Sequence, residues 1–223
     1  MAETEDHILA VDVGGTHIGA AIFAHYAGGK LEPVQHETYR SRTVANIPGL
    51  LRNFLRKHTR RLDPPVRKAC VDFAGPVGPK RSAAFVTNLG RGFTADQIIE
   101  ATGIREVILL NDFEAVGYGV ETLMANHPDA FVRLSRAGKL PSLKGPKPTA
   151  VVIGAGTGLG TTILVSDSKT GMYRPIPGEG GHSDFVAVEE HEFRIAQWIR
   201  KKDRKSTRLN SSHSRASRMP SSA

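Results

Sequence analysis

The sequence predicts an α/β fold built from two related halves. Short apolar runs typical of strands alternate with segments whose apolar residues recur at helical spacing. A unit of strand, glycine-rich turn and strand occurs twice, at residues 8–23 and again at residues 150–165. With 223 residues, the chain is long enough for one large or two small domains with a hydrophobic core.

Composition excludes several classes of protein. No run of about 18 apolar residues occurs, so neither a membrane-spanning helix nor a membrane partner is expected. The N-terminus is acidic and polar, unlike a secretory signal. Cys70 is the only cysteine, which excludes an internal disulfide bond and a multi-cysteine zinc site. These observations favour a cytoplasmic location.

The net charge of +8 is unevenly distributed along the chain. Residues 203–223 contain five basic residues and one acidic residue, which amounts to +4, and they show no apolar periodicity. A disordered basic tail and a nucleic-acid-binding arm are two interpretations. We favour a third, because Asp203–His213 and Ser217–Ala223 resemble, in order and in frame, the translation of a sequencing adapter interrupted by its index. We therefore interpret residues 203–223 as a non-native tail and expect no nucleic-acid partner.

The elements of the first half follow from local pattern. Apolar runs predict strands, glycine pairs predict turns, and the capping-box pattern Thr94-Ala-Asp-Gln97 predicts a helix that ends at Gly103. In chain order we expect strands at 8–12 and 18–23, a helix at 47–60, a strand at 68–73, the helix from Thr94, a strand at 106–110 and a helix starting near Asp112.

The second half of the chain contains the second unit of strand, glycine-rich turn and strand. Residues 138–148, with three prolines and three lysines, predict a linker or a surface excursion. Strands are expected at 150–153 and 161–165, on either side of Gly154–Gly160. We expect the genuine chain to stop within a helix near Lys202, which would make it a fragment.

Two glycine-rich turns are candidate phosphate sites. In Asp12-Val-Gly-Gly-Thr16, glycines let backbone N–H groups approach a phosphate, and Thr16 adds a hydroxyl donor. The alternative is an ordinary β-hairpin with a type I′ turn. Gly154–Gly160 matches neither a P-loop nor a dinucleotide-binding fingerprint. Two such hairpins facing each other would grip one polyphosphate from both sides.

Two further segments carry polar groups. Asn111 and Asp112 follow an apolar strand, where α/β proteins bind their ligands, although both residues are also preferred helix caps. Glu179 and His182 lie in a glycine-rich loop at residues 177–184 and can offer donors and acceptors to a polyhydroxylated ligand. No second histidine lies at metal-ligand spacing, so no metal ligands are assigned.

Together these segments resemble the bacterial glucokinase family, within the superfamily of sugar kinases and actin-like ATPases. The matching text is VDVGGT at 11–16, TNLGRGF at 87–93, LNDFEAV at 110–116, GAGTGLG at 154–160 and PGEGGHSDF at 177–185. The resemblance implies a two-domain sugar kinase fold of the ribonuclease H-like, actin-like type, with an incomplete second domain. We expect a small domain at 1–122, the start of a large domain at 123–202 and the non-native tail at 203–223.

The resemblance also implies ATP-dependent phosphorylation of glucose, with Mg²⁺ as a cofactor. Asp112 matches the catalytic base, and Asn111, Glu179 and His182 match ligands of the sugar hydroxyls. The residues that match the phosphate-binding turns are Val11, Asp12, Val13, Gly14, Gly15 and Thr16, together with Gly154, Gly156, Thr157 and Gly158.

The resemblance leaves some alternatives open. A kinase for another hexose and a non-catalytic sugar-sensing regulator on the same fold are the alternatives to a glucokinase. A homodimer is compatible with the full-length enzyme. Family members continue for roughly a hundred residues beyond this chain, so we expect the fragment to be inactive.

Overall fold

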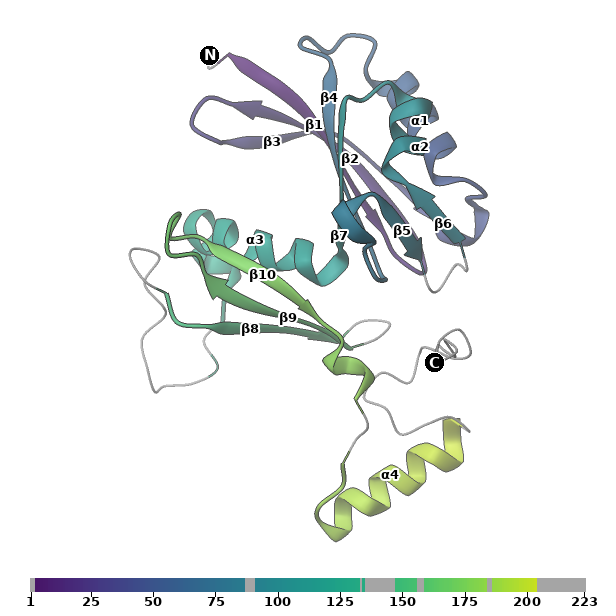
Figure 1. Cartoon of the computed structure of the whole chain (residues 1–223), viewed down its shortest axis with the longest axis vertical. Helices are drawn as coiled ribbons and strands as arrows, with labels where there is room; N and C mark the ends of the chain where they lie inside the picture. The colour runs from purple at the N-terminus through teal and green to yellow at the C-terminus, as the bar shows by residue number, and fades with distance from the viewer. Residues whose placement is uncertain are drawn as a thin grey trace. The chain divides into compact units, whose positions relative to one another are not determined.

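The computed structural model describes residues 3–86, 91–132, 134, 147–155, 159–183 and 186–203. Its contacts divide the chain into two compact units, Met1–Asp112 and Phe113–Ala223 (Figure 1). The domain boundaries expected after residues 122 and 202 stay predictions. Most of the tail interpreted as non-native, residues 204–223, lies outside the described residues.

Unit 1 is built on a five-stranded sheet with the order β3-β2-β1-β4-β7. Its first three strands are antiparallel, whereas β1, β4 and β7 run parallel. Side chains alternate between the two faces, so the buried residues of β1 and β2 recur at every second position. The strands are β1 (Thr4–Val13), β2 (His17–Tyr26), β3 (Leu31–Arg40), β4 (Val66–Phe73) and β7 (Glu106–Asn111).

Two helices cover one face of this sheet, α1 (Ile47–His58) and α2 (Ala95–Thr102) (Figure 1). Asn46 caps α1, because its side chain accepts a hydrogen bond of 3.1 Å from the Gly49 N–H. The capping box predicted at Thr94 is confirmed, and α2 ends at Gly103, whose φ is 76°. The core between the sheet and the helices includes Leu9, Val11, Val13, Ile18, Leu51, Phe54, Val71, Ile98 and Leu109.

Short elements complete unit 1. The 3-10 turn η1 (Ser41–Thr43) follows β3, and η2 (Pro79–Arg81) precedes a small hairpin of β5 (Ala83–Val86) and β6 (Arg91–Thr94). The turn between β2 and β3 contains Gly28 and Gly29 with φ of 85° and 84°, a conformation that favours glycine.

Unit 2 combines a three-stranded antiparallel sheet, in the order β10-β9-β8, with the helix α3. The second strand–turn–strand unit is therefore confirmed. Figure 1 shows α3 lying along one face of this sheet. The elements are α3 (Asp112–Asn126), η4 (Pro128–Ala130), β8 (Ala150–Ala155), β9 (Leu159–Ser166), β10 (Tyr173–Gly178), η5 (Gly180–His182) and α4 (Glu190–Asp203).

The opposite face of the unit 2 sheet carries apolar side chains that are open to solvent. Val151, Ile163 and Ile176 lie in one cross-strand row, because Ile163 pairs with Val151 of β8 and with Ile176 of β10. Their exposed fractions are 58%, 42% and 41%. This row contrasts with Leu164, the next residue of β9, which faces α3 and is only 1% exposed.

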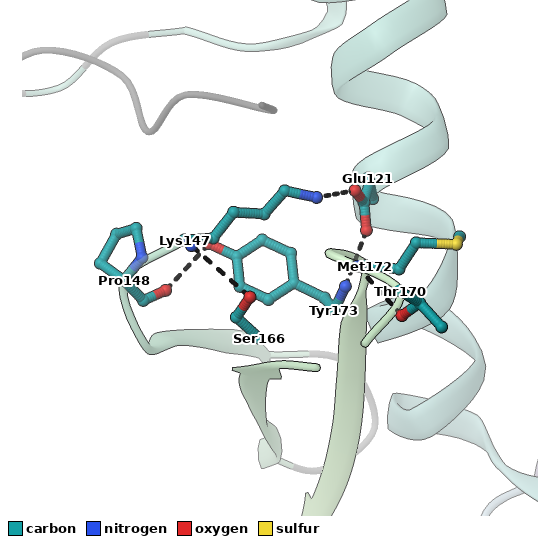
Figure 2. Close-up of polar contacts among 7 residues, drawn as sticks. All are labelled: Glu121, Lys147, Pro148, Ser166, Thr170, Met172 and Tyr173. Atoms are coloured by element: carbon teal, nitrogen blue, oxygen red, sulfur yellow. Dashed lines mark hydrogen bonds and ion pairs between the residues drawn. The ribbon is translucent and has the colours of Figure 1, made fainter. Parts of the chain in front are cut away.

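An ion pair between a buried lysine and a half-buried glutamate joins α3 to the chain that enters β8 (Figure 2). The ammonium of Lys147, whose side chain is 1% exposed, binds the Glu121 carboxylate. Glu121 also accepts a hydrogen bond of 2.9 Å from the Tyr173 N–H, and the Lys147 Nζ lies 5.2 Å from the centre of the Tyr173 ring. Burial favours the neutral acid, but the hydrogen bonds from Lys147 and Tyr173 outweigh it and lower the pKa of Glu121.

Two glycines of α3 give a matched test of this packing. A Cβ at Gly117 would lie 2.7 Å from the Pro175 Cβ of β10, whereas a Cβ at Gly119 would have nothing within 4 Å. We expect Gly117→Ala to destabilise the protein by about 1–3 kcal/mol through overpacking. Gly119→Ala should stabilise it by about 0.5–1 kcal/mol, because alanine restricts the unfolded chain and favours helix. Urea unfolding of both variants measures the difference, and equal effects would contradict the packing.

Removing the Lys147 ammonium should lower the free energy of unfolding. Lys147→Met leaves the half-buried Glu121 carboxylate, which is 18% exposed, without its cation. We expect a smaller loss of stability than the loss of about 3–5 kcal/mol that follows when a fully buried pair is broken. We expect the additional change Glu121→Gln to restore part of this loss. Lys169→Met, at an exposed lysine of the turn before β10, is the control and should leave the free energy of unfolding within about 0.5 kcal/mol of the original. A similar small change for Lys147→Met would show that the pair is not structurally important.

Candidate active site

The turn Gly14–Thr16 joins β1 to β2, and its shape requires glycine at the first position. The Gly14 N–H donates a hydrogen bond of 3.0 Å to the His17 carbonyl, and a Cβ at Gly14 would lie 2.9 Å from that oxygen. Gly14 has a φ outside the left-handed region, so the alternative of a type I′ hairpin turn is wrong. The glycine is therefore explained by close backbone approach.

The residues before the turn alternate in orientation. Val11 and Val13 have side chains that are 2% and 0% exposed, because they face α1 and α2 in the core. Only their backbone groups can contact a ligand. Asp12 lies on the opposite face of β1, and Thr16 is exposed in the turn. The candidate phosphate-binding groups of this segment are thus backbone N–H groups and the Thr16 hydroxyl, whereas the Asp12 carboxylate would repel a phosphate and could contribute only through a bound cation.

Asn111 and Asp112 lie at the carboxyl edge of the same sheet. Asn111 is the last residue of β7, and its side-chain amide donates a hydrogen bond of 3.3 Å to the Gly75 carbonyl. Asp112 is the first residue of α3. Because β1, β4 and β7 are parallel, their carboxyl ends meet at one edge, where α/β proteins bind ligands. Asp112 therefore shares an edge with the Gly14–Thr16 turn.

The structure adds Asp72, to which sequence analysis gave no role. Asp72 lies on β4 directly beside Asp12 of β1, and the two side chains are hydrogen-bonded. Burial, followed by the negative charges of Asp12 and Asp112, raises the pKa of Asp72 to about 8. Burial also raises the pKa of Asp12, opposed by its hydrogen bond with Asp72. At neutral pH the two carboxyl groups therefore hold a proton between them.

The glycines of the second turn have a packing role within unit 2. A Cβ at Gly154 would lie 2.6 Å from the Phe113 ring, and one at Gly160 would lie 1.8 Å from it. Phe113 is the second residue of α3, so these glycines let the start of the helix pack on β8 and β9. The other residues assigned to this turn, Gly156, Thr157 and Gly158, lie outside the described residues.

The loop after β10 packs closely against the start of β9. A Cβ at Gly181 would lie 1.9 Å from the Leu159 carbonyl oxygen, and the Thr161 hydroxyl donates a hydrogen bond of 3.2 Å to the Gly178 carbonyl. Glu179 is exposed just before η5. His182 ends η5, but its side chain lies outside the described residues. The glycine-rich sequence is therefore explained in part by this contact.

Within the described residues, no group of three or more His, Cys, Asp and Glu side chains is arranged to hold a metal ion. In the part of the chain that the structure covers, no helix is both long and apolar enough to cross a membrane.

Comparison with known proteins decides the family. The model of the glucokinase family matches residues 9–210. The chain belongs to the glucokinase family. Glucokinase from Nostoc punctiforme is 32% identical over 194 residues, which cover 86% of this chain and 52% of the relative. The chain thus spans about half the length of the curated glucokinases that it matches, and the resemblance inferred from the motifs is confirmed.

Solved glucokinase structures share the fold. A glucokinase from an Antarctic psychrotroph superposes with a TM-score of 0.63 at 23% identity, over 92% of this chain and 60% of its own. A glucokinase from Balamuthia mandrillaris, solved in complex with glucose, gives a TM-score of 0.62 at 22% identity, over 88% of this chain and 55% of its own. The chain has the mixed α/β fold of the actin-like sugar kinases, as the sequence predicted.

The proton held by Asp72 predicts how stability depends on pH. Its pKa in the folded protein lies above that of an unfolded aspartate, so the folded state loses stability as the pH rises from about 4 to about 8. Asp72→Asn cannot ionise. We expect its free energy of unfolding to rise relative to the original chain by more than about 1 kcal/mol between pH 5 and pH 7, since one pKa unit corresponds to about 1.4 kcal/mol.

Urea unfolding at a series of pH values measures this difference. Asp129→Asn, at an exposed aspartate of η4, is the control and should show no such trend. If the difference between Asp72→Asn and the original chain is independent of pH, the Asp72 carboxyl group titrates normally and the shared proton is wrong.

Proposed function

We propose that the protein represented by this chain is a glucokinase, which transfers a phosphoryl group from ATP to glucose and forms glucose 6-phosphate. Family membership supports the class of reaction. The observation that carries the proposal is the shared sheet edge of unit 1. There, Asp112 follows β7 and the glycine turn Gly14–Thr16 follows the parallel strand β1.

In this proposal Asp112 is the catalytic base. A sugar hydroxyl ionises far above neutral pH, so a carboxylate that accepts its proton as the new bond forms lowers the barrier. Asn111, held by the Gly75 carbonyl, would bind a sugar hydroxyl beside it. Glu179 and His182 of unit 2 are proposed as further ligands of the sugar hydroxyls. The Balamuthia mandrillaris relative was solved with glucose, which supports this choice of substrate.

The turn after β1 fits a phosphate chain. The bound ATP supplies the phosphoryl group that is transferred. The backbone N–H groups of Gly15 and Thr16 and the Thr16 hydroxyl would hold its phosphates, since the Gly14 N–H already donates to the His17 carbonyl. Gly154 and the neighbouring Gly156, Thr157 and Gly158 are proposed for the second turn. Transfer of this kind depends mainly on positioning and charge neutralisation.

Mg²⁺ is proposed as the ion that accompanies ATP. Magnesium in such enzymes is held largely by substrate phosphates and water, with few protein carboxylates. A cytoplasmic location and a homodimer of the full-length enzyme complete the proposal.

The catalytic role of Asp112 can be separated from a role in sugar binding. Asp112→Asn keeps the size of the side chain but cannot accept the proton, so kcat should fall by about 10²–10⁴-fold. We expect the affinity for glucose to remain within about threefold. Asp96→Asn, which changes an exposed aspartate in the first turn of α2, should leave both values unchanged. Glucose calorimetry and coupled kinase assays measure the two quantities.

The assay is made on the product of the gene after it has been sequenced again across the codon for Lys202. Equal turnover by Asp112→Asn would overturn the assignment of the base. A panel of hexoses distinguishes glucose from mannose and amino sugars as the substrate. Sugar binding without any turnover by the unmodified protein would favour the non-catalytic regulator.

A further inference from the structure

A buried serine is hydrogen-bonded to the glycine turn between β1 and β2. Ser41 is the first residue of η1, directly after β3, and is 1% exposed. Its hydroxyl donates a hydrogen bond of 2.7 Å to the Gly14 carbonyl. Its N–H donates a second hydrogen bond of 3.0 Å to the Thr16 carbonyl. One side chain and one backbone group of the same residue therefore bind both ends of the turn.

These two hydrogen bonds determine which way the peptide groups of the turn face. In a trans peptide the C=O and the following N–H point in opposite directions. The only cis peptide among the described residues joins Asp63 and Pro64, so the peptide between Gly14 and Gly15 is trans. Because the Gly14 carbonyl points to Ser41, the Gly15 N–H points away from it. The donor needed for an anion is thus presented on the side of the turn opposite Ser41.

The attachment of Ser41 is itself rigid. β2 and β3 are paired up to His17 and Arg40, which brings the end of β3 alongside the turn. The Ser41 carbonyl accepts a hydrogen bond of 3.2 Å from the Val44 N–H and closes η1. Ser41 therefore has all three of its polar groups engaged, and a change at its hydroxyl affects the Gly14 carbonyl directly.

We propose that Ser41 is a positioning residue for phosphate binding, which holds the Gly14–Thr16 turn with the Gly15 N–H directed at the phosphate chain. The inference rests on the proposed function, because it takes that turn as the phosphate site. Ser41 does not touch the ligand in this arrangement. Its contribution is to remove alternative orientations of the two peptide groups before the anion binds.

Two variants separate this role from a general effect on the fold. Ser41→Ala removes the hydroxyl that binds Gly14, whereas Ser41→Thr keeps it. Thr43→Ala is the matched control, because the Thr43 hydroxyl also donates to a nearby backbone carbonyl, but to that of Arg40 at the end of β3 (2.8 Å) rather than to one in the glycine turn. All variants are made in the full 223-residue chain.

Hydrogen exchange tests the contact without any ligand. In Ser41→Ala, exchange of the Gly14 and Ser41 amides should accelerate about tenfold, the effect expected when one hydrogen bond of ordinary strength is lost. The amides in the middle of β1 should keep their rates. Exchange in Ser41→Thr and Thr43→Ala should match the original chain. Unchanged exchange in Ser41→Ala would overturn the inference.

Inorganic tripolyphosphate tests the link to phosphate, because it needs no contacts to adenosine. We expect Ser41→Ala to weaken its binding by about three- to tenfold, as measured by calorimetry and by the amide shift of Gly15. Glucose affinity should not change. If Ser41→Ala loses exchange protection but binds tripolyphosphate with unchanged affinity, Ser41 has only a structural role, and the inference is overturned. If the unmodified chain does not bind tripolyphosphate, the proposed phosphate site fails, and the inference fails with it.

Discussion

The pairing of β1 on both of its edges fixes the geometry of the candidate site. On one edge β1 pairs with β2, which begins at His17, so the chain must reverse within Gly14–Thr16. On the other edge β1 runs parallel to β4, which places Asp12 beside Asp72. A slip of one residue would turn Asp12 into the core and Val13 out of it, which the burial of Val13 opposes. The burial of the apolar face of β1 therefore determines which side chains lie on its polar face.

Glycines that look alike in the sequence have different physical causes here. Gly14 is required because a Cβ would meet the carbonyl of His17, a constraint within the turn itself. Gly154 and Gly160 leave room for the ring of Phe113, a constraint between a helix and a sheet. Both patterns were read from the sequence as loops that approach a phosphate. The first glycine is explained by a close backbone approach within the turn, and the second pair by the packing of α3 on β8 and β9.

Elements with a local signal in the sequence were predicted, whereas the edge strands β3 and β10, which lack one, were not. The helix α2 has a capping box at one end and a glycine at the other, so both of its ends could be identified from the sequence. The strand β3 escaped prediction because it lies at the sheet edge with mostly exposed side chains and lacks an apolar pattern. The strand β10 contains Pro175 and Pro177, which suggest a loop but are tolerated at an edge.

The site residues divide in the same way. Asp112 and the glycine turn belong to recognisable motifs, so the sequence alone proposes them as candidates. Asp72 was not found, because one acidic residue in a strand has no local signature and matters only when β4 lies beside Asp12. Ser41 was missed for a related reason, since its two hydrogen bonds to the turn exist only after β2 and β3 have paired. Residues that act through long-range contacts are the ones that sequence patterns do not reveal.

The charge at this sheet edge connects the fold with the proposed chemistry. Three carboxyl groups, those of Asp12, Asp72 and Asp112, lie close enough that the charges of the other two raise the pKa of Asp72. If all were ionised, they would repel a phosphate chain at the neighbouring turn. A proton held between Asp12 and Asp72 removes one of these charges at neutral pH. The N–H groups of the turn then face an edge that is less negative, while a carboxylate remains available to accept the proton of a hydroxyl. The shared proton therefore allows three crowded carboxyl groups to lie next to a turn that binds an anion.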